Sequence, residues 1–174
     1  MSEFKEIKPE DIKDNPFKLI GSDWMLITAG DRKSFNTMTA SWGGLGVLWD
    51  KNVAFCFIRP TRYTFEFMNQ SETFTLSFFS EEYRSVLTYC GSHSGRHVNK
   101  MEKCGITPVA GSFNSVHFAE ARLVLECRKI YFADINPSAF LAQTLADIYP
   151  EHDYHRMFIG EIVKVLGRDV TMAG

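Results

Sequence analysis

The sequence predicts one domain over residues 1–174, built as a mainly β, mostly antiparallel barrel with a few peripheral α-helices. Short apolar or alternating runs outnumber the segments with helical periodicity. The helical segments also fall irregularly between the strands, whereas a parallel sheet would alternate strand and helix along the chain. With 45% hydrophobic and 23% charged side chains, a chain of 174 residues is long enough to bury a core.

Five segments carry the patterns of β-strands. Thr73–Phe78 alternates strictly between apolar and hydroxyl side chains, which is typical of a strand buried on one face. Asn52–Ile58 is apolar on both faces and indicates a strand inside the structure. Residues 121–132 alternate as well, with Glu126 expected on the polar face. The remaining predicted strands cover residues 24–29 and 157–166.

Four segments are expected to be helical. Ser80 is placed to cap a helix that runs to Cys90, with Gly91 as the left-handed residue after its end. Asn136 and Pro137 have the pattern of an N-cap and a first-turn proline, and an apolar helix face follows over 140–148. Residues 61–68 and 97–104 give two shorter helices.

Charge and composition exclude several classes of function. The net charge is −2 and no basic tract occurs, so a nucleic-acid partner is not expected. No apolar run approaches the roughly 18 residues that span a membrane. The first twenty residues are charged and lack the apolar core of an export signal, and the four cysteines are too few for a disulfide scaffold. These features predict a cytoplasmic protein with reduced thiols.

Familiar nucleotide and hydrolase motifs are absent from the sequence. It contains no GxGxxG after a strand, no GxxxxGK[ST] phosphate loop and no GxSxG nucleophile turn. A Rossmann site, a P-loop and an α/β-hydrolase nucleophile are therefore not expected.

The segment NTMTASWGGLG, residues 36–46, has an unusual composition. Hydroxyl and amide side chains precede a tryptophan, and three of the next four residues are glycine. Glycine weakens a strand interior because it has no side chain to pack. We therefore do not expect a plain strand here, and we expect a ligand to lie against this backbone.

The loop CGSHSGRHVNK, residues 90–100, offers backbone N–H groups and two cations that suit an anion. It also contains ligand types that zinc accepts, with the spacing C-x2-H-x3-H-x6-C. That spacing matches no standard zinc finger, and both cysteines fall at apolar helix positions, where core thiols are the alternative. The four side chains concerned are Cys90, His93, His97 and Cys104.

Two further segments carry polar side chains next to strands. RPTRYTFEF, residues 59–67, places two arginines and two hydroxyls where a strand gives way to a helix, which suits a phosphate or a solvated helix cap. HDYHRMFIGEI, residues 152–162, places two histidines before the last strand, either as structural groups or beside a proton-transfer site.

Five segments together resemble the flavin reductase-like family, in particular its flavoredoxin-like branch. They are Asn36–Gly44, Arg59–Thr64, Phe74–Phe79, Cys90–Arg96 with Lys100, and His155–Ile162. The resemblance runs from Trp24 to Leu166. It implies the FMN-binding split β-barrel, a homodimer with the flavin site at the subunit interface, and FMN as the cofactor with NADH or NADPH as the possible donor.

The resemblance also implies roles for individual residues. Met38, Thr39, Ala40, Ser41 and Trp42 would line the isoalloxazine ring and the ribityl chain. The other implied positions are Arg59, Thr61 and Arg62 near the 5′-phosphate, Ser77, Phe78 and Phe79 beside the flavin, Ser94, Gly95 and Lys100 in a loop over the ring, and His155 near the hydride donor. No metal is implied.

The sequence departs from the family in this loop, since His97 and Asn99 stand where the family carries acids. The resemblance leaves two functions open. One is an NAD(P)H-dependent flavin reductase, and the other is an electron carrier that holds FMN tightly, exchanges electrons with a redox protein and does not turn over NAD(P)H.

Overall fold

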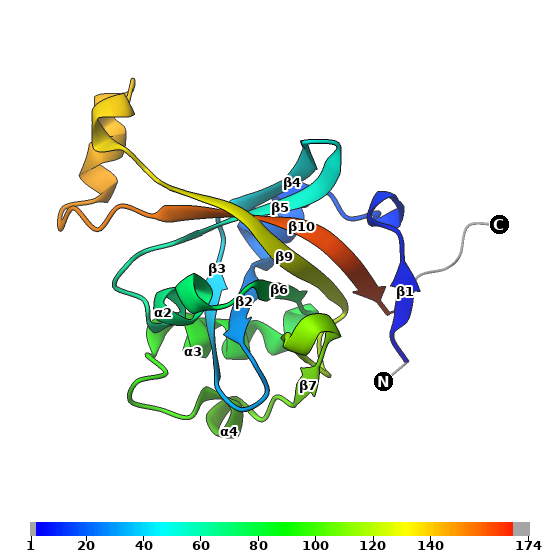
Figure 1. Ribbon diagram of the computed structural model, residues 1–174. Helices are drawn as coiled ribbons and strands as arrows, with labels where there is room; N and C mark the ends of the chain where they lie inside the picture. The colour runs from blue at the N-terminus through cyan, green and yellow to red at the C-terminus, as the bar shows by residue number, and fades with distance from the viewer. Residues whose placement is uncertain (1–2, 169–174) are drawn as a thin grey trace.

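An antiparallel sheet of eight strands forms the body of the protein in the computed structural model, which describes residues 3–168 (Figure 1). Seven of the strands follow one another in the order β3-β2-β6-β9-β10-β5-β4, and β1 pairs with β10. The strands are β1 (Lys5–Ile7), β2 (Met25–Gly30), β3 (Phe35–Ala40), β4 (Gly43–Leu48), β5 (Lys51–Ile58), β6 (Thr73–Phe78), β9 (Leu123–Asp134) and β10 (Arg156–Gly167). The mainly β fold predicted from the sequence is therefore confirmed.

The connection between β3 and β4 explains why this sheet is curled. These strands are the two outer members of the path, yet only Ser41 and Trp42 separate them in sequence. In a flat sheet with strands about 4.8 Å apart, β3 and β4 would lie about 29 Å from each other. The chain from Ala40 to Gly43 can reach only about 11 Å. The two rims must therefore meet, and we call the place where they meet the seam.

The sheet is packed on both faces. One apolar cluster fills the inside of the curled sheet and includes Met25, Ile27, Phe74 and Phe158. A second cluster lies between the outer face and the helices and includes Leu26. Because alternate residues of β2 enter different clusters, this strand is buried on both sides.

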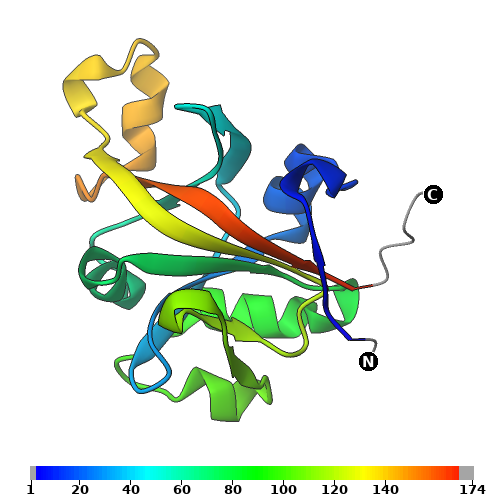
Figure 2. The same cartoon turned by 45° about the vertical axis from the view of Figure 1, so that its right-hand side comes forward.

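Three α-helices of five or more residues lie around the sheet (Figure 2), one of them contributing Met68 to the first cluster and the other two packing against the second. They are α2 (Tyr63–Gln70), α3 (Arg84–Ser92) and α4 (Lys100–Cys104). The shorter elements are η1 (Pro9–Asp11), α1 (Pro16–Lys18), the π-helical turn η2 (Leu19–Asp23), η3 (Glu81–Tyr83), η4 (Ser112–Asn114), and the hairpin of β7 (Pro108–Ala110) with β8 (Val116–Phe118). No helix within residues 3–168 is long and apolar enough to cross a membrane.

An arm between β9 and β10 projects from the sheet and is drawn in yellow and orange in Figure 1. It contains the 3-10 helices η5 (Pro137–Ala139) and η6 (Gln143–Ile148). The α-helix predicted here is wrong, although Asn136 does cap η5 by accepting from the Ser138 amide at 3.0 Å. Only one helical turn forms at the cap, and the chain then extends through Phe140 before η6 begins.

Several local expectations differ from the structure. The segment 36–46 does form strands, and Gly43 fits because a Cβ there would lie 2.6 Å from the Phe55 carbonyl oxygen. Glu126 is buried rather than exposed, since its carboxylate accepts from the Ser112 amide at 2.8 Å and lies 3.6 Å from His117. Ser80 bonds Glu82 instead of capping the helix backbone, and Gly91 lies inside α3.

Candidate functional site

Two adjoining cavities lie along β3, and the first of them opens at the seam. The first, here the strand cavity, has a volume of about 240 Å³, and the second, the loop cavity, about 120 Å³. Met38 and Arg62 line both cavities, so the two are direct neighbours. The strand cavity is also lined by Thr39, Ala40, Ser41, Trp42, Phe57, Arg59 and His155, and the loop cavity by Asn36, Thr61, Tyr63, Thr64, Ser92, His93, Ser94, Gly95 and Lys100.

Strand β3 supplies the floor of this site and is fixed to two helices by hydrogen bonds. The Asn36 amide donates to the Thr64 hydroxyl of α2 at 2.7 Å. The Thr39 hydroxyl donates to the Leu87 carbonyl of α3 at 2.5 Å. Gly91 allows this close approach, because a Cβ there would lie 3.3 Å from the Thr39 Cβ. The polar side chains of Asn36 and Thr39 therefore hold β3 against the helices and also line the cavities.

Arg62 and Lys100 bring positive charge to the site without a carboxylate to balance it. Arg62 donates to the Gly91 carbonyl at 2.6 Å, and Lys100, which is 5% exposed, donates to the carbonyls of Thr37 and Cys90 at 2.6 and 2.9 Å. Neither forms an ion pair with a carboxylate of residues 3–168. Burial lowers the pKa of Lys100 to about 8, which reflects the cost of holding an ammonium group away from water.

Arg59 is held differently, because it has an acidic partner. Its guanidinium donates to both carboxylate oxygens of Asp153 at 2.8 and 3.0 Å and to the Ile148 carbonyl at 3.1 Å. It also lies 5.0 Å from the ring centre of Tyr149. Arg59 therefore ties the end of β5 to the arm at the rim of the strand cavity.

His155 is a neutral imidazole in this site. Its pKa is lowered to about 4 by burial, with the nearby Arg59 charge adding to the effect. Its Nδ1 lies 2.9 Å from the Tyr149 hydroxyl, which fixes the orientation of the ring. Its Nε2 has no hydrogen-bond partner within residues 3–168 and can meet a ligand. The ring also packs against Trp42, with the ring centres 4.9 Å apart.

An apolar groove of about 630 Å³ lies beside the strand cavity and shares Ser41, Trp42 and Phe57 with it. The groove separates α1 and η2 from the arm. Its other lining residues are Pro16, Phe17, Ile20, Gly21, Gly43, Gly44, Leu45, Ile135, Phe140, Leu145, Ile148 and Tyr149. A flat aromatic ligand at the seam would thus have apolar surface on one side and cations on the other.

The structure brings most of the predicted site residues together. Lys100, Ser94 and Gly95, predicted over the flavin ring, lie in the loop cavity with Thr61 and Arg62. The predicted residues that line one of the two cavities are Met38, Thr39, Ala40, Ser41, Trp42, Arg59, Thr61, Arg62, Ser94, Gly95, Lys100 and His155.

Ser77, Phe78 and Phe79 line neither cavity. Ser77 is fully buried in β6 between β2 and β9, and Phe78 packs in the cluster inside the sheet. Phe79 packs in the outer cluster near Tyr83 and Phe118. Their side chains are therefore placed to stabilise the core, and the predicted position beside the flavin does not follow from this geometry.

The four candidate zinc ligands are not gathered into one cluster. His93 stacks on Tyr89 with ring centres 3.9 Å apart, and His97 is exposed on the loop. Only the two cysteines meet, with their sulfur atoms 3.9 Å apart. Within residues 3–168, no group of three or more His, Cys, Asp or Glu side chains could hold a metal ion.

Several residues that line or contact the cavities are not among the predicted site residues. Asn36 and Thr64 line the loop cavity and lie in the segments 36–46 and 59–67, which the sequence marks as candidate sites. Their amide and hydroxyl groups are the feature that could have identified them as site residues. Phe57 looks like any apolar strand residue, and Tyr149 and Asp153 act through contacts made across the arm. Asn99, which stands where the family carries an acid, caps α4 by accepting from the Glu102 amide at 3.3 Å.

Comparisons with solved structures support the fold. A flavoredoxin of Desulfovibrio vulgaris is 24% identical with a TM-score of 0.67, over 86% of this chain and 72% of that chain. An FMN-binding domain of a flavin reductase-like enzyme from Shewanella baltica is 17% identical with a TM-score of 0.69, over 95% and 78%. The NADH:FAD oxidoreductase of Streptomyces globisporus is 16% identical with a TM-score of 0.63, over 82% and 74%.

No curated protein matches the chain. The model of the flavin reductase like domain, in contrast, matches residues 17–172, which is most of the sequence and includes every residue that lines the two cavities. The seam of the curled sheet, its cation-lined cavities and this match lead to one conclusion. The chain belongs to the flavin reductase-like family and has its split-barrel fold.

Proposed function

We propose that this protein binds FMN at the seam and transfers hydride or electrons through it, as an NAD(P)H-dependent flavin reductase. One observation carries the proposal. Arg62 and Lys100 are partly or fully buried cations that face the cavities and donate only to backbone carbonyls. A buried charge is costly unless it is paired. A phosphate carries about −1.5 to −2 charges at pH 7 and would supply the missing counter-charge.

The loop cavity fits the phosphate better than the strand cavity does. Thr61 and Arg62 precede α2, whose first amides favour an anion, and Ser94 and Gly95 face them from the loop before α4. The guanidinium of Arg62 can bind two phosphate oxygens at once, whereas Lys100 acts as a point charge. The isoalloxazine ring would then lie in the strand cavity against Ser41 and Trp42.

The residues of the chain bind, orient and shield the reacting groups. Bound FMN supplies the hydride and electron chemistry. Trp42 and the apolar groove would exclude water from one face of the ring. His155, held by Tyr149, offers its Nε2 near that face without a proton-dependent charge at pH 7, because its pKa is about 4. His155 would therefore orient the nicotinamide donor through a hydrogen bond without placing a positive charge beside it.

Titration of the purified protein with FMN, followed by flavin fluorescence, tests the proposal. We expect Arg62→Met to weaken binding by about ten- to a hundredfold, since a charged hydrogen bond contributes about 1.5–3 kcal/mol. Arg96→Met is the matched control, because Arg96 pairs with Glu66 on the surface and lines neither cavity. Equal losses in both variants, or no FMN binding by the wild type, would contradict the proposed site.

Anaerobic addition of NADH or NADPH to the FMN-bound protein separates the two functions that the family allows. Bleaching of the flavin absorbance with oxidation of the nicotinamide supports a reductase. Tight FMN that stays oxidised under these conditions would instead support the electron carrier, whose partner is a redox protein. The binding site is the same in both cases, so this measurement leaves the FMN proposal intact.

We also propose that the protein is a homodimer. Apolar side chains are exposed on the arm and on the rim of the groove, including Leu141 at 101% and Phe17 at 86%. Contiguous exposed apolar surface is typical of an interface. Light scattering should give twice the mass of one chain, 19.9 kDa. Leu141→Glu should shift the equilibrium toward monomer, while Phe113→Glu, on η4, should not.

A further inference from the structure

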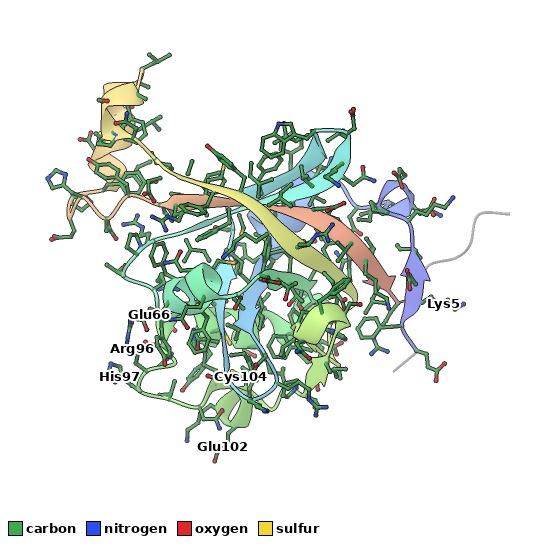
Figure 3. All side chains as sticks on the ribbon, in the orientation of Figure 1. Lys5, Glu66, Arg96, His97, Glu102 and Cys104 are labelled. Carbon is green, nitrogen blue, oxygen red and sulfur yellow. The ribbon has the colours of Figure 1, made fainter. Side chains whose placement is uncertain are left out.

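The side chains of Cys90 and Cys104 are in contact, and neither of them lines one of the two cavities. Their sulfur atoms lie 3.9 Å apart, in contact but not bonded. Cys90 is fully buried on α3, whereas Cys104 is partly exposed as the last residue of α4. Figure 3 shows Cys104 turned toward the body of the protein, while Glu102 of the same helix points away.

The two helices are able to bring these sulfur atoms together. A disulfide has a sulfur–sulfur distance of about 2.05 Å, so the pair must close by about 1.9 Å. Helix α4 has only five residues, and Gly105 ends it in the left-handed conformation with no atom within 4 Å of the position of a Cβ. Closure therefore needs a side-chain rotation and a small shift of a short peripheral helix, and the sheet can stay in place.

We propose that Cys90 and Cys104 form a reversible intramolecular disulfide when the protein meets a peroxide. The partly exposed Cys104 is the thiol that the oxidant reaches, and the buried Cys90 is the one that resolves the product. Peroxide-sensitive cysteines are solvent-accessible and often lie next to a resolving cysteine, and this pair has both of these features without the lowered pKa that speeds the reaction. Cys56 and Cys127 are buried in the sheet and take no part.

The reaction balances with hydrogen peroxide as the named oxidant. The Cys104 thiolate attacks one peroxide oxygen, the O–O bond breaks, and hydroxide leaves to give a sulfenic acid. The Cys90 sulfur then attacks the Cys104 sulfur, the S–O bond breaks, and a second hydroxide leaves. Two thiols lose two electrons and two protons, the peroxide is reduced, and two water molecules form. A dithiol reductant reverses the bond by exchange.

Burial sets the speed of this reaction. It raises the pKa of Cys90 to about 12 and also raises the pKa of Cys104, while the ammonium of Lys100 opposes both effects. The thiolate is the reactive form, so the pair stays reduced under brief exposure and reacts faster as the pH rises. Between pH 7 and pH 8.5 we expect the rate to increase roughly tenfold per pH unit.

The disulfide would also affect the loop cavity, and this part rests on the proposed function. The bridge encloses the chain between residues 90 and 104, which includes Ser94, Gly95 and Lys100 of that cavity. Lys100 already donates to the Cys90 carbonyl at 2.9 Å. A covalent bond between α3 and α4 limits the opening of this segment, so bound FMN should leave at least threefold more slowly from the oxidised protein.

Thiol counting tests the disulfide independently of any flavin. The FMN-free protein is treated with hydrogen peroxide at pH 8 and titrated with a thiol reagent after denaturation. We expect the four thiols of the chain to fall to two, a mass loss of about 2 Da, and a cross-linked peptide that contains both residues. Treatment with a dithiol should restore all four.

Two variants make the result decisive. Cys104→Ser should keep its three remaining thiols under the same treatment, and Cys56→Ala should still lose two. Four free thiols in the treated wild type, a bridge between two chains, or stable over-oxidation of Cys104 with Cys90 free would overturn the proposal. If the disulfide forms but FMN leaves at an unchanged rate, the proposed disulfide stands and only its proposed effect on the loop cavity is refuted.

Discussion

At the scale of single residues, Lys100 illustrates how burial prepares a group for a ligand. Its ammonium is almost completely enclosed and donates to two carbonyls, which satisfy hydrogen bonds but leave the charge unbalanced. The pKa is lowered to about 8 because the neutral amine is easier to bury. A lysine in this state should change its charge within the range in which FMN binding can be measured.

The affinity for FMN should therefore depend on pH through Lys100. A phosphate binds the protonated amine better, and its second ionisation near pH 6 is complete above pH 7. As the pH rises through about 8, the amine loses its proton, and we expect the Kd to increase about tenfold between pH 7 and pH 9. Flavin fluorescence titrations at several pH values measure this change.

The Lys100→Met variant should bind more weakly and lose this pH dependence. Lys103→Met is the matched control, since Lys103 lies exposed on the same helix and lines neither cavity. An unchanged pH dependence in Lys100→Met would show that another group is responsible.

At the scale of elements, Gly160 lies at a tightly packed point of β10. A Cβ at this position would lie 2.6 Å from the Phe74 ring and 2.7 Å from the Cys127 Cβ, and the register with β9 shifts beside it. Gly160→Ala should lower the free energy of unfolding by about 1–3 kcal/mol, because the core cannot take the extra methyl group without moving the sheet. Urea denaturation measures the change.

Gly21→Ala is the control for this prediction. A Cβ at Gly21 meets no atom within 4 Å, so alanine should leave stability unchanged or raise it slightly by restricting the unfolded chain. If both variants unfold at the same urea concentration, the packing argument for Gly160 is wrong.

The elements also show which parts of the fold the sequence can predict. Thr73–Phe78 forms β6 with the predicted bounds, because its alternation follows directly from burial of one face. The strands within residues 36–46 could not be predicted from the sequence, because the reason for a glycine at position 43 lies in another strand. A Cβ there would lie 2.6 Å from the Phe55 carbonyl oxygen, so only glycine fits. Glu126 shows the same limit, because its burial depends on the Ser112 amide and His117.

The site was predictable to a similar extent. Residues in continuous motifs, such as Met38 to Trp42, were found by the family resemblance and do line the strand cavity. Tyr149 and Asp153 carry no local signal, because they reach the site only through the course of the arm. The family resemblance also gives Ser77 to Phe79 a place beside the flavin, and in this structure their side chains are buried in the core and line neither cavity.

At the scale of the whole molecule, two buried histidines should make the protein sensitive to mild acid. Burial lowers the pKa of His117, and it lowers that of His155 to about 4. The unfolded chain binds their protons near pH 6.5, so it is favoured as the pH falls below that value. For His155 alone, we expect about 1.5 kcal/mol of stability to be lost between pH 6.5 and pH 5.

Urea unfolding at these two pH values tests the expectation. The loss should be smaller in His155→Gln, which has no group to protonate there. His97→Gln, which changes an exposed histidine, should lose as much stability as the wild type. A wild-type stability that stays constant over this range would contradict the burial of both imidazoles in the neutral form.

The two-residue link between β3 and β4 has a consequence for the thermodynamics of the fold. Only Ser41 and Trp42 join the rims of the sheet, and the site touches β3, β5 and the segment before β10 at that place. A molecule bound there contacts both rims of the sheet at once and stabilises the closed barrel. At a concentration one hundred times its Kd, it adds about 2.7 kcal/mol to the folded state. Occupancy of the site and resistance to heat should therefore rise together in this protein.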